Sequence, residues 1–514
     1  TGVQTCALPI SHHALIFLEE DLAVLYRLLQ TSKGAEILSD NQVQIMFLSD
    51  LTTTKLLLNE LTWTYFDAPY LITALSLYLK ENSEGFQEIE NQIRLKFEWK
   101  KAVVHEYLNF GIAFYRNFYP NLLELPKAYL GNTLFNRFPN VPAIICGAGP
   151  SLNKNIDLLP EFKDRALLFA GGSALNALIP KGIVPHFGAG IDPNIAQYSR
   201  VAVAENLSFP FFYNNRLYHE ALKVVKGPRL YLNGVGGFSI SSWFEEKLGI
   251  EGEILDAGHN VVNFCIQIAR ALGCNPIILI GVDLAFTGEQ CYAEGVTTSA
   301  KIGTEEVITH DPDNIPIVRK DIYGNPISTL WKWVIESEWI SKFAEEHPHL
   351  KVINATEGGL GFSTIPTMSL AEVAQKYLVE PRPEIDQIEE IISKTPLNHL
   401  KPETIIVLQR ELQESISQCA KLCSHMIHEF DLLEKKIMNG ESPSFPLSTP
   451  AIARLEAEFE SEMAYIYILE IFNSIFIHRY HRKMQEIQSP PPFLSKQDQA
   501  LNQLALNKQR LIFL

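Results

Sequence analysis

A glycine-rich turn near the middle of the chain is the stretch whose residues best suit chemistry. Residues Val141–Leu152 read VPAIICGAGPSL, in which Ala143–Cys146 is a short apolar run typical of a buried strand. Gly147 and Gly149 allow a sharp turn and a close approach of the backbone to a ligand. Pro150–Ser151 suits the first turn of a helix, whose N–H groups and positive dipole end favour a phosphate. A plain tight strand-to-helix connection would use the same residues.

The same turn argues against two common nucleotide sites. The GxGxxG dinucleotide fingerprint requires a third glycine where Leu152 stands, and the next apolar run, Ala166–Ala170, is followed by Gly171-Gly172-Ser173 rather than by an acidic residue for a ribose. A Walker loop requires Gly-Lys followed by Ser or Thr, which this turn lacks. The turn therefore predicts a phosphate-bearing ligand, but neither NAD nor the ATP site of a P-loop enzyme.

Short apolar runs alternate with helical patterns from Val141 to about Pro366, which predicts an α/β domain: a Rossmann-like, doubly wound parallel sheet covered on both faces. The expected strands are Ala143–Cys146, Ala166–Ala170, Phe187–Ile191, Pro210–Tyr213, Leu230–Leu232, Glu253–Leu255, Pro276–Gly281 and Leu350–Ile353. The expected helices include Ser173–Ile179, Val261–Leu272 and Ser328–Glu345.

Polar and glycine-rich segments come after these strands, on the side where open parallel sheets bind ligands. They are Gly147–Ser151, Gly171–Ser173, Asp192–Asn194, Asn214–Arg216, Asp256–Asn260, Asp283 and Asn354–Gly359. Their amides and hydroxyls suit a nucleotide phosphate and a sugar. We predict ligand contacts from Gly147, Gly149, Pro150, Ser151, Gly171, Gly172, Ser173, Asn215, Asn260, Asp283, Asn354 and Thr356.

Metal-ligand spacing is not evident in these segments, which contain no HExxH motif, no DxD motif and no His pair. Asp311-Pro312-Asp313 is a superficial DxD motif inside a polar insertion, Thr287–Ser328, that we expect to form a mobile lid. Cys419 and Cys423 lie on an apolar stripe and are expected to pack rather than to bind metal. We predict group transfer that needs neither a metal nor another cofactor.

The flanking regions predict a three-domain chain. Residues 11–140 suggest a mixed, mostly helical domain with a connector, residues 141–367 the Rossmann-like domain, and residues 368–514 an all-α domain. In the last region Pro402–Met438 carries an unbroken apolar stripe, and Ala451–Ile487 is expected to return as one helix of a hairpin.

Composition narrows the class of protein. The net charge of −16 disfavours nucleic acid as the main partner. The seven cysteines form no CxxC pair, which favours reduced thiols and a cytoplasmic location. No run of about 18 apolar residues predicts a membrane span. Because the chain begins at Thr1 rather than Met, we expect a piece of a longer protein, and its first segment, Thr1–Ile10, differs in character from the remainder of the chain.

Several segments together resemble one known family. They are GAGPSL (Gly147–Leu152), AGGSALNALIPKGIVP (Ala170–Pro185), GIDP (Gly190–Pro193), ALGCNPIILIGVDLAF (Ala271–Phe286), YGNPIST (Tyr323–Thr329) and NATEGGL (Asn354–Leu360). In this order the region Val141–Pro366 resembles the central domain of the motility-associated factor (Maf) proteins, which glycosylate flagellin. The GxGPSL turn and the LIGVD segment are also similar to the bacterial CMP-sialate sialyltransferases.

The resemblance implies a glycosyltransferase with a CMP-activated nonulosonic acid, such as pseudaminic acid, as donor and protein Ser or Thr hydroxyls as acceptor. It places the donor's phosphate and ribose at Gly147–Ser151, flanked by Gly171–Ser173, with Asp192 and Asp283 lining the same pocket. Two positions depart from the pattern, His186, where relatives often carry an acidic residue, and His259-Asn260, which replaces a more hydroxylic pair.

The expected mechanism is direct displacement at the anomeric carbon, with a base that takes the acceptor's proton. His259 is the first candidate because histidine titrates near neutrality, and Asp192 and Glu357 are the alternatives. The C-terminal helices are the expected docking region for a flagellin-like acceptor or for self-association. Two other functions compete: a hydroxymethylpterin pyrophosphokinase that uses ATP and Mg²⁺, and a degenerate, non-catalytic binding protein.

Overall fold

The computed structural model describes residues 14–19, 21–40, 42–47, 58–59, 61–65, 68–202, 207–234, 238–255, 258, 260–296, 316–480, 483–484, 487 and 494–514. Contacts divide the chain into two compact units. The smaller comprises Thr1–Val103 with Ile477–Gln485, and the larger comprises Val104–Phe476 with Glu486–Leu514. The three-domain division stays a prediction.

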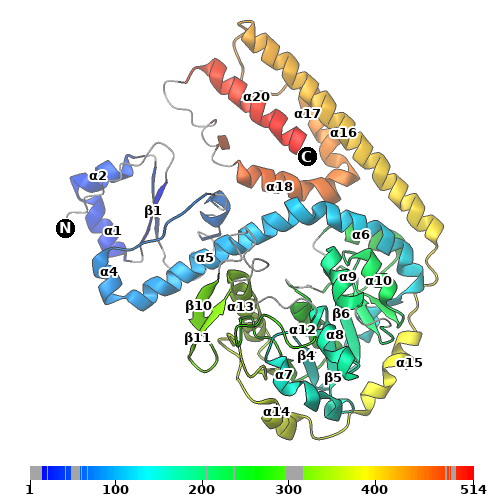
Figure 1. Ribbon diagram of the computed structural model, residues 1–514. Coiled ribbons are helices and arrows are strands. Elements are labelled where there is room, and N and C mark those ends of the chain that lie inside the picture. The colour runs from blue at the N-terminus through cyan, green and yellow to red at the C-terminus, as the bar shows by residue number, and fades with distance from the viewer. Residues whose placement is uncertain are drawn as a thin grey trace. The chain divides into compact units, whose positions relative to one another are not determined.

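An eight-stranded sheet forms the centre of the larger unit (Figure 1), and its strands pair in the order β12-β9-β4-β5-β6-β7-β8-β3. Every pairing in it is parallel, so the carboxyl ends of all the strands lie at one edge. The strands are β3 (Tyr129–Leu130), β4 (Ala143–Cys146), β5 (Leu167–Gly171), β6 (Phe187–Gly190), β7 (Phe211–Tyr213), β8 (Arg229–Tyr231), β9 (Ile277–Ile280) and β12 (Val352–Asn354). The predicted parallel sheet is confirmed.

Both faces of the sheet are covered, because alternate residues of each strand enter different cores. In β4, Ile144 and Cys146 belong to one hydrophobic cluster, whereas Ala143 and Ile145 belong to the other. The first cluster contains residues of α6 (Gly111–Glu124), α7 (Leu152–Asn155), α8 (Ser173–Leu178), α10 (His219–Val224) and α11 (Ile240–Leu248). The second contains residues of α12 (Val261–Leu272), α13 (Trp331–Glu346) and α15 (Ile388–Ser393). This layering confirms the Rossmann-like α/β class.

One predicted strand of the central domain is wrong. Glu253–Leu255 is irregular, and the backbone oxygen of Glu253 accepts a hydrogen bond from the Asn132 side chain at 2.9 Å. The place beside β8 is taken instead by β3, a two-residue strand too short to recognise from the sequence. The other seven expected strands match observed strands within two residues at each end.

The polar insertion after β9 begins and ends against the central domain. Ala293 N–H donates to Ala148 O at 2.8 Å, so the start of the insertion crosses the glycine-rich turn. Its far end is an antiparallel pair, β10 (Ile317–Lys320) and β11 (Pro326–Thr329). Residues 297–315, with the DxD motif at Asp311 and Asp313, lie outside the described residues. The mobile lid stays a prediction.

The C-terminal region is helical, as predicted. The long helix α16 (Pro402–Met438) matches its predicted bounds, and α17 (Pro450–Ser461) and α20 (Lys496–Phe513) pack along it (Figure 1). Cys419 and Cys423 are buried in its packing stripe, which confirms their packing role.

The predicted single return helix Ala451–Ile487 is wrong. The chain leaves helical geometry at Glu462, whose ψ is 137°, and resumes in a π-helical turn, Tyr465–Leu469, and α18 (Glu470–Arg479). Ser415 of α16 holds the break: its hydroxyl donates to Glu462 Oε2 at 2.6 Å and accepts from Ala464 N–H at 3.0 Å. Ser415 therefore satisfies a backbone group that the interrupted helix leaves unpaired.

The smaller unit is mixed, as predicted. A parallel pair, β1 (Leu15–Glu19) and β2 (Val43–Phe47), is joined by α1 (Leu22–Leu29) and α2 (Ser32–Leu38). Further along lie α4 (Ser76–Glu81) and most of α5 (Ser83–His105). Its core consists of Leu58, Leu61, Ile93 and Phe97.

Candidate active site

The candidate site lies at the topological switch point of the sheet. Strands β5 to β8 follow β4 in sequence and lie on one side of it, whereas the later strands β9 and β12 lie on its other side. In open α/β sheets the crevice beyond the strand ends at such a point is where ligands bind. Six of the seven predicted polar segments come after strands of this parallel sheet and so lie at its carboxyl edge. The seventh precedes α12 instead, and within it Asp256, Ala257 and His259 lie outside the described residues.

Asp283, just past β9, connects the loops at the switch point. Its side chain is 1% exposed and accepts three donors: Ser151 Oγ at 2.7 Å, Ser151 N–H at 3.3 Å and Thr287 Oγ1 at 2.7 Å. Burial raises the pKa of this carboxyl above its ordinary value, although the hydrogen bonds from Thr287 and Ser151 oppose the rise. Asp283 thus joins the end of β9 to the start of α7.

Gly147 and Gly149 must be glycines because the end of β9 leaves no space for a side chain at either position. A Cβ on Gly147 would lie 2.3 Å from Gly281 O, and a Cβ on Gly149 would lie 2.1 Å from Asp283 Oδ2. Sequence analysis assigned this closeness to a ligand, whereas the structure places β9 there. The reason is that β9 is inserted directly beside β4.

The N–H groups of the turn donate hydrogen bonds to the end of β9 and to Asp283. Gly147 N–H donates to Ile280 O and Gly149 N–H to Gly281 O, both at 2.8 Å. Ser151, 1% exposed, gives both its N–H and its hydroxyl to Asp283. The carboxylate of Asp283 is therefore the anion at the start of α7. Phosphate binding by Gly147, Gly149, Pro150 and Ser151 stays a prediction, and it requires either a shift of Asp283 or a phosphate position beside it.

The end of β5 meets the start of α12. A Cβ on Gly171 would lie 2.3 Å from Val261 Cγ2, and Gly172 has a φ of 50°, a conformation that glycine adopts easily. Ser173 then begins α8, and Asn260 caps α12 by accepting a hydrogen bond from Asn263 N–H at 2.9 Å. These predicted residues border the same edge, and Asn260 has a structural role there.

The two alternative base candidates also make structural contacts. Asp192, after β6, accepts from Asn194 N–H at 3.0 Å and pairs with Arg200 at 3.2 Å. Glu357, after β12, has a φ of 57°, and its Oε1 accepts from Leu370 N–H at 3.0 Å at the start of α14 (Leu370–Tyr377). Neither carboxylate is held close to Asp283 by a hydrogen bond, and the side chain of His259 lies outside the described residues.

Three further predicted residues are buried and tie loops together. Asn354 accepts from Thr356 N–H at 3.1 Å, and Thr356 Oγ1 accepts from Val282 N–H at 3.3 Å, so the loops after β12 and β9 are joined. Asn215 donates to Tyr231 OH at 3.1 Å, at the end of β7. Each of these three residues is no more than 2% exposed, so they hold the loops in place from the protein interior.

Two residues that sequence analysis did not single out lie at the same edge. Asn263 in α12 is fully buried, and Glu336 in α13 has a buried Oε2 atom. Burial raises the pKa of Glu336 to about 8, with a smaller opposing effect from Lys332. Perturbed carboxyls of this kind concentrate at functional sites. The signal in the sequence was a glutamate inside an aromatic helix, WKWVIESEW.

Glu336 is expected to make stability fall as the pH rises. The folded protein keeps this proton up to about pH 8, whereas the unfolded chain releases it near its ordinary pKa of 4.5. The free energy of unfolding should therefore decrease across that window and be insensitive to this group outside it. Glu336→Gln removes the titration.

Urea unfolding of wild type and Glu336→Gln at about pH 5 and about pH 8 measures this effect. The wild type should lose on the order of 2 kcal/mol relative to the variant, less than the full shift implies because part of the side chain meets water. A difference between the two proteins that does not change with pH would contradict the prediction.

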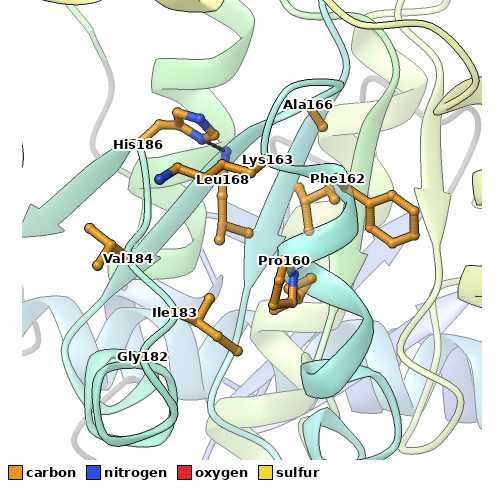
Figure 2. Close-up of a pocket in the computed structure, with 11 residues that line it drawn as sticks. Pro160, Phe162, Lys163, Ala166, Leu168, Gly182, Ile183, Val184 and His186 are labelled. Atoms are coloured by element: carbon orange, nitrogen blue, oxygen red, sulfur yellow. Dashed lines mark hydrogen bonds between the residues drawn. The ribbon is translucent and has the colours of Figure 1, made fainter.

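A small pocket of about 100 Å³ lies at the opposite, amino edge of the sheet (Figure 2). Its lining includes His186, just before β6, and Lys163 and Ala166, just before β5. In Figure 2 a dashed line joins the His186 ring to the backbone nitrogen of Leu168, which donates to Nδ1 at 2.9 Å. Burial lowers the pKa of His186 to about 4, so this ring is neutral at pH 7 and serves the packing of β5 and β6.

Within the part of the chain that the structure describes, no three His, Cys, Asp or Glu side chains gather as metal ligands would. The six cysteines in these ranges, from Cys146 to Cys423, are free thiols that form no disulfide. In these same ranges, no helix is both long enough and apolar enough to cross a bilayer.

Comparisons with known proteins agree with this fold. A family model described as "6-hydroxymethylpterin diphosphokinase MptE-like" matches residues 116–289. An uncharacterised protein of Treponema pallidum (strain Nichols) is 33% identical over 86 residues, which cover 14% of this chain and 41% of that protein. The chain thus spans less than half the length of this relative.

The structure of a Maf glycosyltransferase from Magnetospirillum magneticum AMB-1 superposes with a TM-score of 0.52 at 15% identity, covering 97% of this chain and 70% of that chain. The predicted resemblance to the Maf proteins is confirmed at the level of the fold. At this identity the likeness concerns the fold alone.

Proposed function

We propose that this protein is a glycosyltransferase that moves a nonulosonic acid from a CMP-activated donor to Ser or Thr hydroxyls of a protein such as flagellin. The observation that carries the proposal is the switch point between β4 and β9, where glycine-rich and polar loops meet at one edge of a parallel sheet. The fold likeness to a Maf glycosyltransferase supports the same reaction class. The protein would act in the cytoplasm and without a metal or other cofactor.

The reaction would be a displacement at the anomeric carbon. The acceptor oxygen bonds to this carbon while the bond to the CMP phosphate oxygen breaks, and CMP leaves with the electron pair. A base takes the hydroxyl proton. His259 remains the first candidate for this base because Asp192 and Glu357 already pair with Arg200 and with the start of α14. The C-terminal helices remain the proposed docking region for the acceptor.

A second candidate function is supported by one finding. The family model named for 6-hydroxymethylpterin diphosphokinase matches residues 116–289, which contain the glycine-rich turn and Asp283. That activity would transfer a diphosphate group from ATP with the help of Mg²⁺. A carboxylate would then have to serve the metal, and Asp283 and Asp192 are the candidates at the carboxyl edge. A third possibility, a non-catalytic binding protein, would bind none of these nucleotides.

Thermal unfolding with CMP, CDP, UDP and ATP, each with and without Mg²⁺, tests the proposal. CMP at about 100 times its Kd should raise the melting temperature by about 3 °C without Mg²⁺. A rise with ATP that requires Mg²⁺ would favour the kinase instead. No rise with any nucleotide would favour the binding protein. Release of CMP from a CMP-sugar, monitored with and without His259→Ala, then tests the base.

A further inference from the structure

Two polar side chains on the α12 and α13 side of the candidate site are buried without hydrogen bonds. Asn263 is 0% exposed, and within the described structure neither its Oδ1 nor its Nδ2 has a partner. The Oε2 atom of Glu336 is likewise buried and unpaired. Because each unpaired buried polar atom costs about 1–3 kcal/mol, three of them near one site call for an explanation.

The helices that carry the two side chains, α12 and α13, approach each other at Trp339. A Cβ on Gly258 would be 2.4 Å from Cβ of Asn263 and 3.2 Å from Cζ2 of Trp339, so Trp339 and Asn263 are neighbours. Glu336 precedes Trp339 by three residues in α13 and shares its face of the helix. It is therefore one turn nearer the start of α13 than the residue that packs beside Asn263.

The start of α13 is anchored to the loops of the site. Thr329 Oγ1 donates to Leu284 O at 2.7 Å, directly after Asp283, and Ser337 Oγ donates to Gly361 O at 2.7 Å, in the loop after β12. Glu336 lies between these two anchors in the sequence. Its position is thus fixed at the edge where the loops after β9 and β12 meet.

Asn263 differs from other buried asparagines at this edge. Asn215 also has an unpaired Oδ1, but its Nδ2 donates to Tyr231 OH. Asn214 has an unpaired Nδ2, but its Oδ1 accepts from Arg216 N–H. Each of these side chains therefore holds the fold with one atom, whereas neither side-chain atom of Asn263 does so.

We propose that Asn263 and Glu336 form the subsite for the hydroxyl-bearing, uncharged part of the donor sugar, an inference that rests on the proposed function. The Asn263 amide supplies a donor group, Nδ2, and an acceptor atom, Oδ1, which together match a sugar hydroxyl. The Glu336 carboxyl does not suit a phosphate or carboxylate, because an anion beside it would be repelled or would have to share its proton. Its raised pKa is consistent with a neutral group that donates.

Calorimetric titration with CMP and with CMP-N-acetylneuraminic acid, which adds a sugar to the same nucleotide, separates this subsite from the nucleotide site. The variants are Asn263→Leu and Glu336→Met, which keep similar volumes. Ser241→Ala is the matched control, since Ser241 Oγ in α11 is also buried and unpaired. Each substitution at Asn263 or Glu336 should weaken the CMP-sugar relative to CMP by about tenfold, and Ser241→Ala should leave this ratio unchanged.

The melting temperature is the second readout. Removal of an unpaired polar atom should raise it by about 2 °C in Asn263→Leu and in Glu336→Met, in contrast to the loss expected of groups that hold the fold. The subsite is overturned if wild type binds both ligands and the ratio does not change in the variants, or if both variants melt lower. If wild type binds neither ligand, the proposed function is overturned and the subsite with it.

Discussion

Asp283→Ala is expected to lower the free energy of unfolding by about 3 kcal/mol and to weaken nucleotide binding through the looser switch point. The substitution removes the acceptor of Ser151 N–H, Ser151 Oγ and Thr287 Oγ1 while the surrounding loops remain closed to water. Each buried donor left unpaired costs about 1–3 kcal/mol, and the hydroxyls can recover part of this by turning to other acceptors. The start of α7 then keeps only the backbone bonds of Gly147 and Gly149 to the end of β9, so the switch point should be less firmly held.

Urea unfolding and CMP titration measure the two effects. Asp157→Ala is the matched control, since Asp157 makes an exposed ion pair with Lys181 and should cost less than about 1 kcal/mol. Asp283→Asn keeps one acceptor oxygen and should recover part of the stability. Equal stability of Asp283→Ala and Asp157→Ala would show that the connection between β9 and α7 does not depend on this carboxylate.

Gly149→Ala is expected to have an effect of similar size for a steric reason. The new Cβ would lie 2.1 Å from Asp283 Oδ2 and 2.8 Å from Gly281 O, distances that real Cβ atoms do not tolerate. Either the Asp283 side chain must leave Ser151 or the end of β9 must move. Overpacking of this kind costs about 1–3 kcal/mol, so we expect a loss near the upper value and weaker CMP binding.

Gly182→Ala provides the control for Gly149→Ala. Gly182 has a φ of 74°, and a Cβ added there would lie in open space. Alanine at this position should therefore cost only the backbone strain of a left-handed conformation, about 1 kcal/mol. CMP affinity should be unchanged in this control. If Gly149→Ala unfolds at the same urea concentration as Gly182→Ala and binds CMP like wild type, the close contact of Gly149 with Asp283 does not limit stability or binding.

The elements of the central domain could be predicted because burial on both faces leaves a strong trace in the sequence. Ile277–Ile280 is apolar at every position, as a parallel strand between two helical layers must be. Helix α12 begins at a capping asparagine, Asn260, and ends before Gly273, whose φ is 91°. The apolar run and the helix caps are both local patterns, so they can be recognised without knowledge of the fold. The two-residue β3 and the break at Glu462 depend on distant partners and leave no such trace.

The candidate site was predictable in its location and not in its contacts. Sequence analysis placed polar loops at the carboxyl ends of the strands, and the structure brings six of them to one edge. It could not foresee that Asp283 would take the Ser151 amide, because the two residues are 132 positions apart. The aromatic helix around Glu336 was a weak signal, since residue types alone do not show whether a helical carboxyl meets water or the interior.

The sequence by itself determined seven of the eight strands of the central sheet, most helices and the resemblance to the Maf proteins, because these depend on residue types at short spacing. Tertiary structure alone decided the order of the strands, and through that order the neighbours of every loop. Insertion of β9 beside β4 gives Gly147 and Gly149 their steric constraint and gives Asp283 its hydrogen-bond donors. The physical reason is that close contacts and burial depend on which segments meet in space, whereas secondary structure depends mainly on which residues are adjacent in the chain.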